Sequence, residues 1–170
     1  DVNCRRYGGW GIYTDEGSTD ILIEKNIAYR CNSSPFHQHY GRDNLIVNNI
    51  FAFGRDNQIE RSRIEGHLSF MFRRNIVYYD QGELLGRRWD RPQAELDHNL
   101  YFHAGGKPVR PAGMSLAEWQ AMGMDKGSLV ADPLFRDPAN GDFRLRRGSP
   151  AAKVGFEPFD VSDVGPRPRV

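Results

Sequence analysis

The chain has little cysteine, no long apolar run and no charge excess. It holds only Cys4 and Cys31 among its 170 residues, which matches neither a zinc site nor a disulfide framework and leaves a bond between the two open. No stretch approaches the roughly 20 apolar residues of a membrane-spanning helix, so we expect no membrane partner. With 23 basic and 22 acidic residues, and arginines spread among acids, we expect no nucleic-acid partner.

Two further signals are missing. No glycine-rich loop opens a helix, which argues against a nucleotide-dependent oxidoreductase. No Asn-Gly or Asp-Gly pair occurs before Asn140-Gly141, although such pairs mark tight hairpins, so an antiparallel sandwich is disfavoured. Glycine is nevertheless abundant at 18 residues, with ten prolines, which indicates many turns of other kinds.

What the chain does contain is a repeat. An asparagine followed by Ile or Leu and an apolar or aromatic run recurs at Asn26, Asn49, Asn75 and Asn99, in "EKNIAYRC", "VNNIFAFG", "RRNIVYYD" and "DHNLYFHA". The segments around it are rich in Ile, Leu, Val, Phe and Tyr without helical periodicity, so they are predicted strands. A period of about 24 residues with two or three strands indicates a parallel β-helix.

The fold prediction is therefore all-β: a right-handed parallel β-helix solenoid of about 4–5 coils over residues 1–105. We expect each repeated asparagine to occupy a left-handed bend and to bond the equivalent asparagine of the next coil. One period before Asn26 lies Asn3. We therefore expect the chain to begin partway through a coil and to be the C-terminal part of a longer β-helix, whose N-terminal coils would be its partner.

Residues 106–170 lack the repeat and are predicted to form a C-terminal cap of the same domain. "GKPVRPAG" is typical of a loop, and a short helix is expected over 115–122. Ser115 would be its N-cap, Glu118 would complete a capping box, and Gly123 would follow its C-terminal end. A final strand, the Asn-Gly turn and a last short strand would then shield the end of the solenoid.

Stacking the coils on their asparagines brings "GIYTDE", "FHQHYG", "QIERSR" and "ELLGRR" onto one sheet. Alternation along a strand turns Tyr13 and Asp15 outward with His37 and His39. The third strand presents either Glu60 or Arg61, depending on register. The candidate residues on this face are Tyr13, Asp15, His37, His39, Glu60, Arg61 and, in one register, Arg87; Glu16, Asp43, Glu65 and His67 lie in the adjoining turns, and Trp10 is either a core residue or a platform for a sugar.

This collection of acids, imidazoles and aromatic rings is typical of a polar-ligand cleft. Hydrolysis of a glycosidic bond needs an acid and a second carboxylate, and coils about 4.8 Å apart can supply either required separation. We predict Asp15, Glu16 and Glu60 as candidate catalytic carboxylates. The predicted substrate-binding residues are Tyr13, His37, His39, Arg61, Glu65, His67 and Trp10. No metal site is predicted, because no third ligand accompanies the two histidines.

Several motifs carry a resemblance. "GGWGIYTDEGS", "FHQHYG", "NNIFAFG", "EGHLSF" and "ADPLFRDPANGDFRLRRGSPA" resemble the C-terminal half of bacterial right-handed parallel β-helix proteins of the pectate-lyase-like superfamily. The likeness is closest to glycoside-hydrolase-like members whose relatives act on α-L-fucosides or xylan. The family's W-G-I-Y-x-D-E-G run matches at Trp10 to Gly17. The resemblance implies secreted or periplasmic polysaccharide processing by a pair of carboxylates on the β-helix cleft.

The sequence thus favours a glycoside hydrolase acting on a plant or algal polysaccharide, without a cofactor. A polysaccharide lyase is the first alternative; it would use a base and often Ca²⁺ to neutralise the substrate's acid group. A non-catalytic carbohydrate-binding or structural module is the second. The sugar, the stereochemical outcome, the second carboxylate and the oligomeric state are not predicted.

Overall fold

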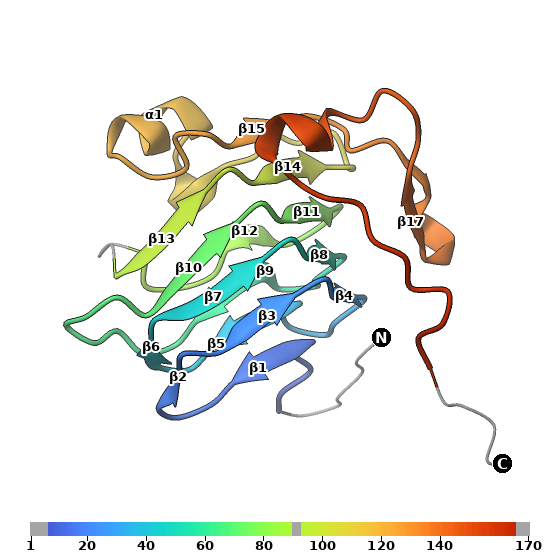
Figure 1. Ribbon diagram of the computed structural model, residues 1–170. Coiled ribbons are helices and arrows are strands. Elements are labelled where there is room, and N and C mark those ends of the chain that lie inside the picture. The colour runs from blue at the N-terminus through green and yellow to red at the C-terminus, as the bar shows by residue number, and fades with distance from the viewer. Residues whose placement is uncertain (1–6, 90–92, 166–170) are drawn as a thin grey trace, which may run out of the picture.

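A computed structural model describes residues 7–89 and 93–165 of the chain and shows a parallel β-solenoid of about four turns (Figure 1). Three parallel sheets form its walls. Sheet 1 contains β1 (Ile12–Thr14), β5 (Phe36–Gln38), β9 (Asn57–Arg61) and β12 (Glu83–Leu85). Sheet 2 contains β3 (Leu22–Glu24), β7 (Asn44–Val47), β10 (Phe70–Arg73) and β13 (Ala94–Asp97). Sheet 3 contains β4 (Ile27–Tyr29), β8 (Ile50–Ala52), β11 (Ile76–Tyr79), β14 (Leu100–His103) and β15 (Leu129–Val130).

Inward side chains from the three sheets fill the solenoid. Four phenylalanines, Phe36, Phe51, Phe70 and Phe72, are fully buried there. The Phe36 ring centroid lies 5.4 Å from that of Phe70 and 5.8 Å from that of Phe72. Burying such a side chain is worth about 1.5–3 kcal/mol, so this aromatic stack contributes much of the coil's stability. The apolar strand runs seen in the sequence are these core positions.

The repeated asparagines form the predicted ladder. The main-chain N–H of Asn49 donates to Oδ1 of Asn75 at 2.9 Å, and its Nδ2 donates to the same oxygen at 3.0 Å. Asn26 donates in the same way to Asn49, and Asn75 to Asn99. Each amide of the buried rungs also donates to a main-chain carbonyl one coil back, as Nδ2 of Asn75 does to Ile46 at 2.9 Å. The amide contact between coils is therefore confirmed.

The expected backbone conformation of these asparagines was wrong by one residue. The left-handed bend is at the preceding position, with φ between 52° and 57° at Lys25, Asn48, Arg74 and His98. The bend turns the chain, and the asparagine after it can then aim both its main-chain N–H and its side-chain amide at the next coil. Asn48 is the one bend residue that is itself asparagine, the type that tolerates this region best.

The C-terminal segment covers one end and one side of the solenoid (Figure 1). Helix α1 (Leu116–Ala121) has Ser115 as N-cap and the predicted capping box with Glu118. An antiparallel hairpin of β16 (Phe135–Asp137) and β17 (Asp142–Leu145) packs Phe135 and Phe143 against the outer side chains of sheet 3. The remaining elements are β2 (Ser18–Thr19) and β6 (Gly41–Arg42), which pair in parallel, and 3-10 turns η1 (Pro111–Gly113), η2 (Pro138–Asn140) and η3 (Pro150–Val154).

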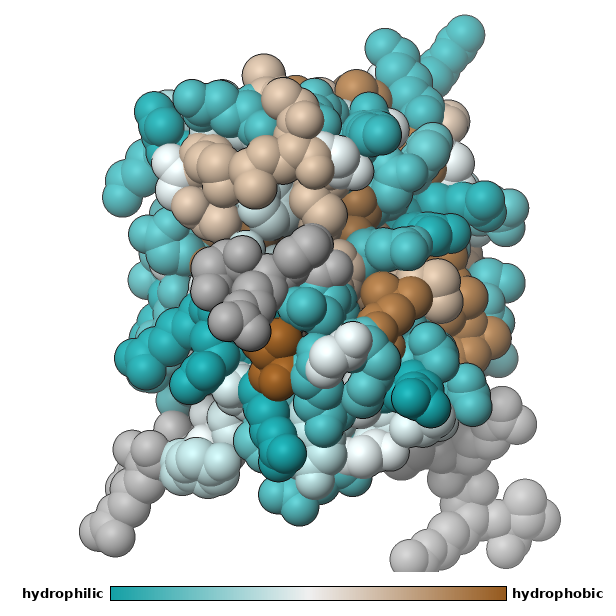
Figure 2. Space-filling model, turned by 90° about the vertical axis from the view of Figure 1, so that its left-hand side faces the viewer, coloured by the Kyte–Doolittle hydropathy of each residue, from teal (hydrophilic) through white to brown (hydrophobic). Residues whose placement is uncertain are grey.

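The cap thus covers the outer face of sheet 3, where Phe135 and Phe143 pack on Ile50 and Ile76. The turn side of the coils, where β2 and β6 lie, carries mainly hydrophilic side chains, with apolar ones in small separate groups (Figure 2). Within the two described ranges, no helix is long and apolar enough to cross a membrane.

Candidate functional site

The register of sheet 1 decides which predicted residues share its outer face. Tyr13 pairs with His37, and His37 pairs with Glu60. Because paired residues on parallel strands point to the same side, these three side chains form one row across three coils. The choice between Glu60 and Arg61 is thereby settled: Glu60 belongs to the outer row.

Arg61 has the opposite orientation, which corrects its expected place on the outer face. It pairs with Gln38, is only 1% exposed, and lies in the interior row of the strand. Its Nε and Nη2 donate to the carbonyl oxygen of Arg88 at 2.9 and 2.6 Å, and its guanidinium lies 4.5 Å from the Trp89 ring centroid. These contacts hold the last turn of the solenoid against β9.

Trp10, which precedes β1, packs against the outer row and donates a hydrogen bond to Glu60. Its ring stacks on Tyr13 with centroids 4.6 Å apart and lies 4.5 Å from the His37 ring. Its Nε1 donates to Oε2 of Glu60 at 3.2 Å, and the hydroxyls of Ser33 and Ser34 lie 3.3 and 3.1 Å from the same oxygen. The sequence carried no signal for either serine, because both lie in a turn.

Asp15 is exposed at the end of β1 and is bonded to the row through Tyr13. The Tyr13 hydroxyl donates to Oδ1 of Asp15 at 2.8 Å. This hydrogen bond lowers the pKa of the Asp15 carboxyl below its ordinary value, while burial and the neighbouring Asp15 charge raise the pKa of Tyr13. Asp15 is therefore an ionised carboxylate at neutral pH.

Ser62 joins the two predicted histidines. Its Oγ lies 2.9 Å from Nε2 of His37 and 2.7 Å from Nδ1 of His39. The other nitrogen of His39, Nε2, lies 3.7 Å from Oε1 of Glu16. His37 is only 3% exposed, and burial lowers its pKa, so its imidazole is neutral at neutral pH. The alternation that turns Glu60 outward also turns Ser62 outward, so this residue was detectable from the strand pattern.

Glu65 and His67 form a separate pair in the turn after β9. His67 Nε2 lies 3.3 Å from Oε2 of Glu65 and 3.2 Å from the carbonyl oxygen of Gly41. Arg63 lies 3.9 Å from the same carboxylate and over the Tyr40 ring at 4.3 Å. These two predicted residues therefore adjoin the site without entering its row.

A polar groove of about 730 Å³ runs along coils two to four of sheet 1. Glu60 and Ser62 line it, with Arg87 and Arg88 on the following coil. Leu85 pairs with Ile59, so Gly86 lies beside Glu60 and has no side chain to cover it. A groove of this size is in the range of small-ligand sites. Asp15 and Glu16 are not among its lining residues.

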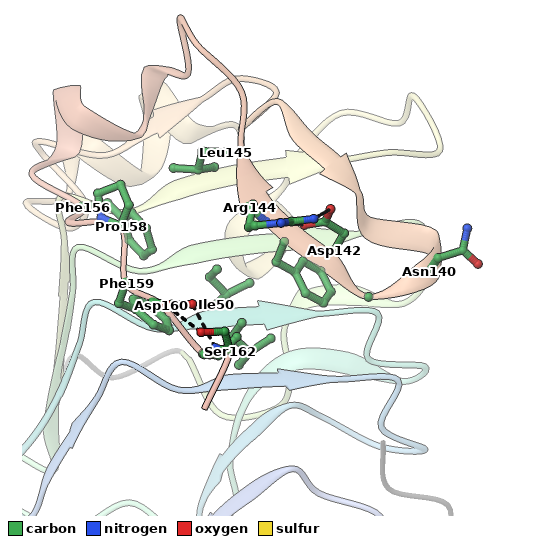
Figure 3. A pocket seen from close by; sticks show the side chains of 14 residues that line it. Ile50, Asn140, Asp142, Arg144, Leu145, Phe156, Pro158, Phe159, Asp160 and Ser162 are labelled. Carbon is green, nitrogen blue, oxygen red and sulfur yellow. Dashed lines mark hydrogen bonds and ion pairs between the residues drawn. The ribbon is translucent and has the colours of Figure 1, made fainter. Parts of the chain in front are cut away.

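A second cavity of about 520 Å³ lies between the β16–β17 hairpin, the following tail and sheet 3 (Figure 3). Phe143, Phe156 and Phe159 form much of its wall, and Asp142 and Arg144 pair with each other at 2.6 Å near its edge. None of the predicted site residues lines it.

Within the described part of the chain, no cluster of three or more His, Cys, Asp or Glu residues is arranged to hold a metal ion. Cys31 is buried, and Cys4 lies outside the described residues. No family model, curated protein or solved structure matches the chain, so the likeness to pectate-lyase-like proteins stays an expectation from its motifs.

Proposed function

We propose that the outer face of sheet 1 binds a polysaccharide and hydrolyses a glycosidic bond, with Glu60 as one of the two carboxylates. The observation that carries this proposal is the set of contacts around the Glu60 carboxylate. Three donors hold its Oε2, it lines a polar groove, and Trp10 and Tyr13 stack beside it. A held carboxylate next to aromatic rings suits a sugar, whose C–H faces pack on rings and whose hydroxyls need polar partners.

Asp15 is the proposed second carboxylate. It follows β1, and Glu60 lies on β9, two strands away in the sheet. Glu60 is in register with Tyr13, so two strand spacings of about 10 Å and a two-residue offset of about 7 Å put the backbones of Asp15 and Glu60 about 12 Å apart. This is nearer the carboxylate separation of inverting glycosidases, about 6.5–9.5 Å, than the about 5–5.5 Å of retaining ones. The ionised Asp15 would take a proton from the attacking water. Glu60 would carry a proton on Oε1 while Oε2 accepts its three hydrogen bonds, and it would give that proton to the departing sugar oxygen, so water adds across the broken bond. Glu16 is the alternative base.

The test is a panel of polysaccharides and aryl glycosides, including xylan and α-L-fucosides, assayed for new reducing ends. Glu60→Gln and Asp15→Asn are expected to lower kcat/KM by about 1,000-fold. Glu24→Gln, an exposed change on β3 of sheet 2, is the matched control and should leave turnover unchanged. Proton NMR of the first product anomer should report inversion.

Other outcomes would replace the proposal. Unsaturated, ultraviolet-absorbing products that a chelator abolishes would establish the lyase alternative, and sugar binding without turnover would establish a binding module. Normal turnover by Glu60→Gln would remove Glu60 from the chemistry. A polysaccharide substrate also implies a secreted or periplasmic location, which fractionation of the producing cells checks.

A further inference from the structure

Glu16, His39 and Ser62 form a chain of polar contacts at the edge of the groove. Ser62 Oγ lies 2.7 Å from Nδ1 of His39, and Nε2 of His39 lies 3.7 Å from Oε1 of Glu16. A hydroxyl, an imidazole within hydrogen-bond reach and a carboxylate beside the imidazole are the three parts of a serine hydrolase site; here the carboxylate lies at ion-pair distance and not at hydrogen-bond distance. Such sites are recognised by geometry and roles, and they occur on unrelated folds.

Ser62 is also open to a ligand. It is partly exposed and lines the groove of about 730 Å³ together with Glu60. His39 lies behind it on the neighbouring coil, since β5 and β9 are paired in parallel. His39 is not among the residues that line this groove, so a substrate in the groove can reach Oγ without displacing the imidazole.

His37 completes the surroundings of the hydroxyl. Its Nε2 lies 2.9 Å from Ser62 Oγ, while its Nδ1 is buried without a hydrogen-bond partner in the described residues. The tautomer with hydrogen on Nε2 fits this setting, because a buried N–H without an acceptor would be costly. That N–H donates to Oγ, so the hydroxyl proton points to Nδ1 of His39. The two histidines thus give Ser62 one acceptor and one donor.

We propose that Ser62 is the nucleophile of a carboxylic-ester hydrolase site, with His39 as general base and Glu16 orienting His39. The ligand class is a short acyl ester of a polar alcohol, such as an O-acetyl group. Ser62 Oγ bonds to the carbonyl carbon while its proton passes to Nδ1 of His39. The ester C–O bond then breaks, and the leaving alcohol takes that proton. Water hydrolyses the acyl-serine by the same route and releases the carboxylic acid.

The groove supplies positive charge for the oxyanion of this reaction. Arg87 and Arg88 both line it on the coil after Ser62. A guanidinium beside the carbonyl oxygen stabilises the negative charge that develops there, the largest single contribution in many acyl-transfer sites. Ester hydrolysis needs no glycosidic cleavage, and its product is an acid rather than a reducing end. This activity therefore stands or falls separately from the glycoside hydrolysis proposed above.

The experiment uses two probes, p-nitrophenyl acetate for turnover and a fluorophosphonate for covalent labelling. The whole chain should hydrolyse the ester, and peptide mapping by mass spectrometry should place the phosphonyl group on Ser62. Ser62→Ala should lose the label and at least about 100-fold in kcat/KM. Ser162→Ala, an exposed serine whose hydroxyl bonds Asp160, is the control and should keep both.

His39→Gln should abolish labelling while Ser62 is still present, which separates activation of the serine from its mere presence. Far-UV circular dichroism and thermal melting of each variant establish that the fold is kept. A label on another residue, no label and no turnover in the native sequence, or equal turnover by Ser62→Ala would each overturn the assignment.

Discussion

Glu60 and Arg61 are neighbours in the chain, yet their side chains lie on opposite sides of sheet 1. Glu60 joins Tyr13 and His37 in the outer row, whereas Arg61 is buried against Arg88 and Trp89. A shift of one residue in register would exchange these two positions. Both side chains are charged, and charged residues rarely occupy interior positions. Residue type alone therefore could not predict which of the two is buried.

Arg61→Met is expected to lower the free energy of unfolding by about 3 kcal/mol. The substitution removes both hydrogen bonds to the part-buried Arg88 carbonyl oxygen and the contact of the buried guanidinium with Trp89. Urea unfolding followed by tryptophan fluorescence measures the change. Arg42→Met, at an exposed position in β6, should stay within about 0.5 kcal/mol of the native chain; equal effects at both positions would contradict the structural role of Arg61.

Tyr13→Phe is expected to raise the pKa of the Asp15 carboxyl. The Tyr13 hydroxyl donates to Asp15 and stabilises its ionised form, and this bond is the largest cause of the lowered pKa. Removing the donor favours the protonated form, so Asp15 should titrate at higher pH than in the native chain. Carbon-detected NMR of the aspartate carboxyls measures this directly. An unchanged Asp15 titration would mean that the hydrogen bond is absent in solution.

At the scale of the elements, the strands are short, and the asparagine ladder links each coil to the next. Most strands of sheets 1 to 3 contain only three or four residues, too few to be stable as isolated pairs. Each inner asparagine adds donors and acceptors along the axis of the solenoid. The ladder therefore stabilises the stacking of coils in addition to the sheet hydrogen bonds.

Asn75→Ala is expected to destabilise the protein by about 3–5 kcal/mol, and Asn26→Ala by about 1 kcal/mol. Asn75 is fully buried, and its loss removes the acceptor of the Asn49 main-chain N–H and one of the acceptors of the Asn49 side-chain amide. Asn26 is exposed, and no described residue donates to its Oδ1. Chemical denaturation of the two variants gives the comparison. A smaller cost at Asn75 than at Asn26 would refute the ladder's energetic role.

At the scale of the whole molecule, Asp125 connects the last coil to the C-terminal cap. It accepts from the Tyr101 hydroxyl at 2.8 Å and from Trp119 Nε1 at 2.9 Å, and it also accepts from Ser128 and from Asn99 at the end of the ladder. Trp119 comes from α1, so one carboxyl group joins the helix, sheet 3 and the asparagine ladder. It is almost fully buried.

This burial predicts a pH dependence of stability. Burial raises the pKa of the Asp125 carboxyl above its ordinary 3.8, against the opposing effect of its four donors. The folded state therefore holds this proton more tightly than the unfolded state. The stabilising contribution of Asp125 to the free energy of unfolding is fully present below pH about 3.8 and is lost as the pH rises through the folded-state pKa of this carboxyl.

The difference in unfolding free energy between the native chain and Asp125→Asn isolates this group. The free energy of unfolding of the native chain minus that of Asp125→Asn should decrease as the pH rises from about 4. Carboxyls with lowered pKa, such as Asp97 and Asp142, favour the opposite trend but are shared by both proteins and cancel. Denaturation at a series of pH values measures the difference; a flat or rising difference would show that Asp125 does not bind its proton more tightly when folded.

The solenoid, the asparagine ladder and the helix cap could be predicted from the order of residues along the chain. A period of about 24 residues, apolar strands and a recurrent asparagine can be read along the chain, because each depends on local spacing and residue type. The outer position of Tyr13 and His37 followed from strand alternation in the same way. The bend residues were misplaced by one, since both neighbours were polar and the asparagine was the more obvious choice.

The composition of the site, in contrast, depends on how the coils stack on one another. The pairing of β5 with β9 places Glu60, and not Arg61, on the outer face. The hydrogen bonds that hold the Glu60 carboxylate come from Ser33 and Ser34, which lie in a turn without a sequence signal. Ser62 meets His37 and His39 because coils of unequal length stack in one particular register. Contacts between residues more than twenty positions apart are set by this stacking, and loop lengths alone do not specify it.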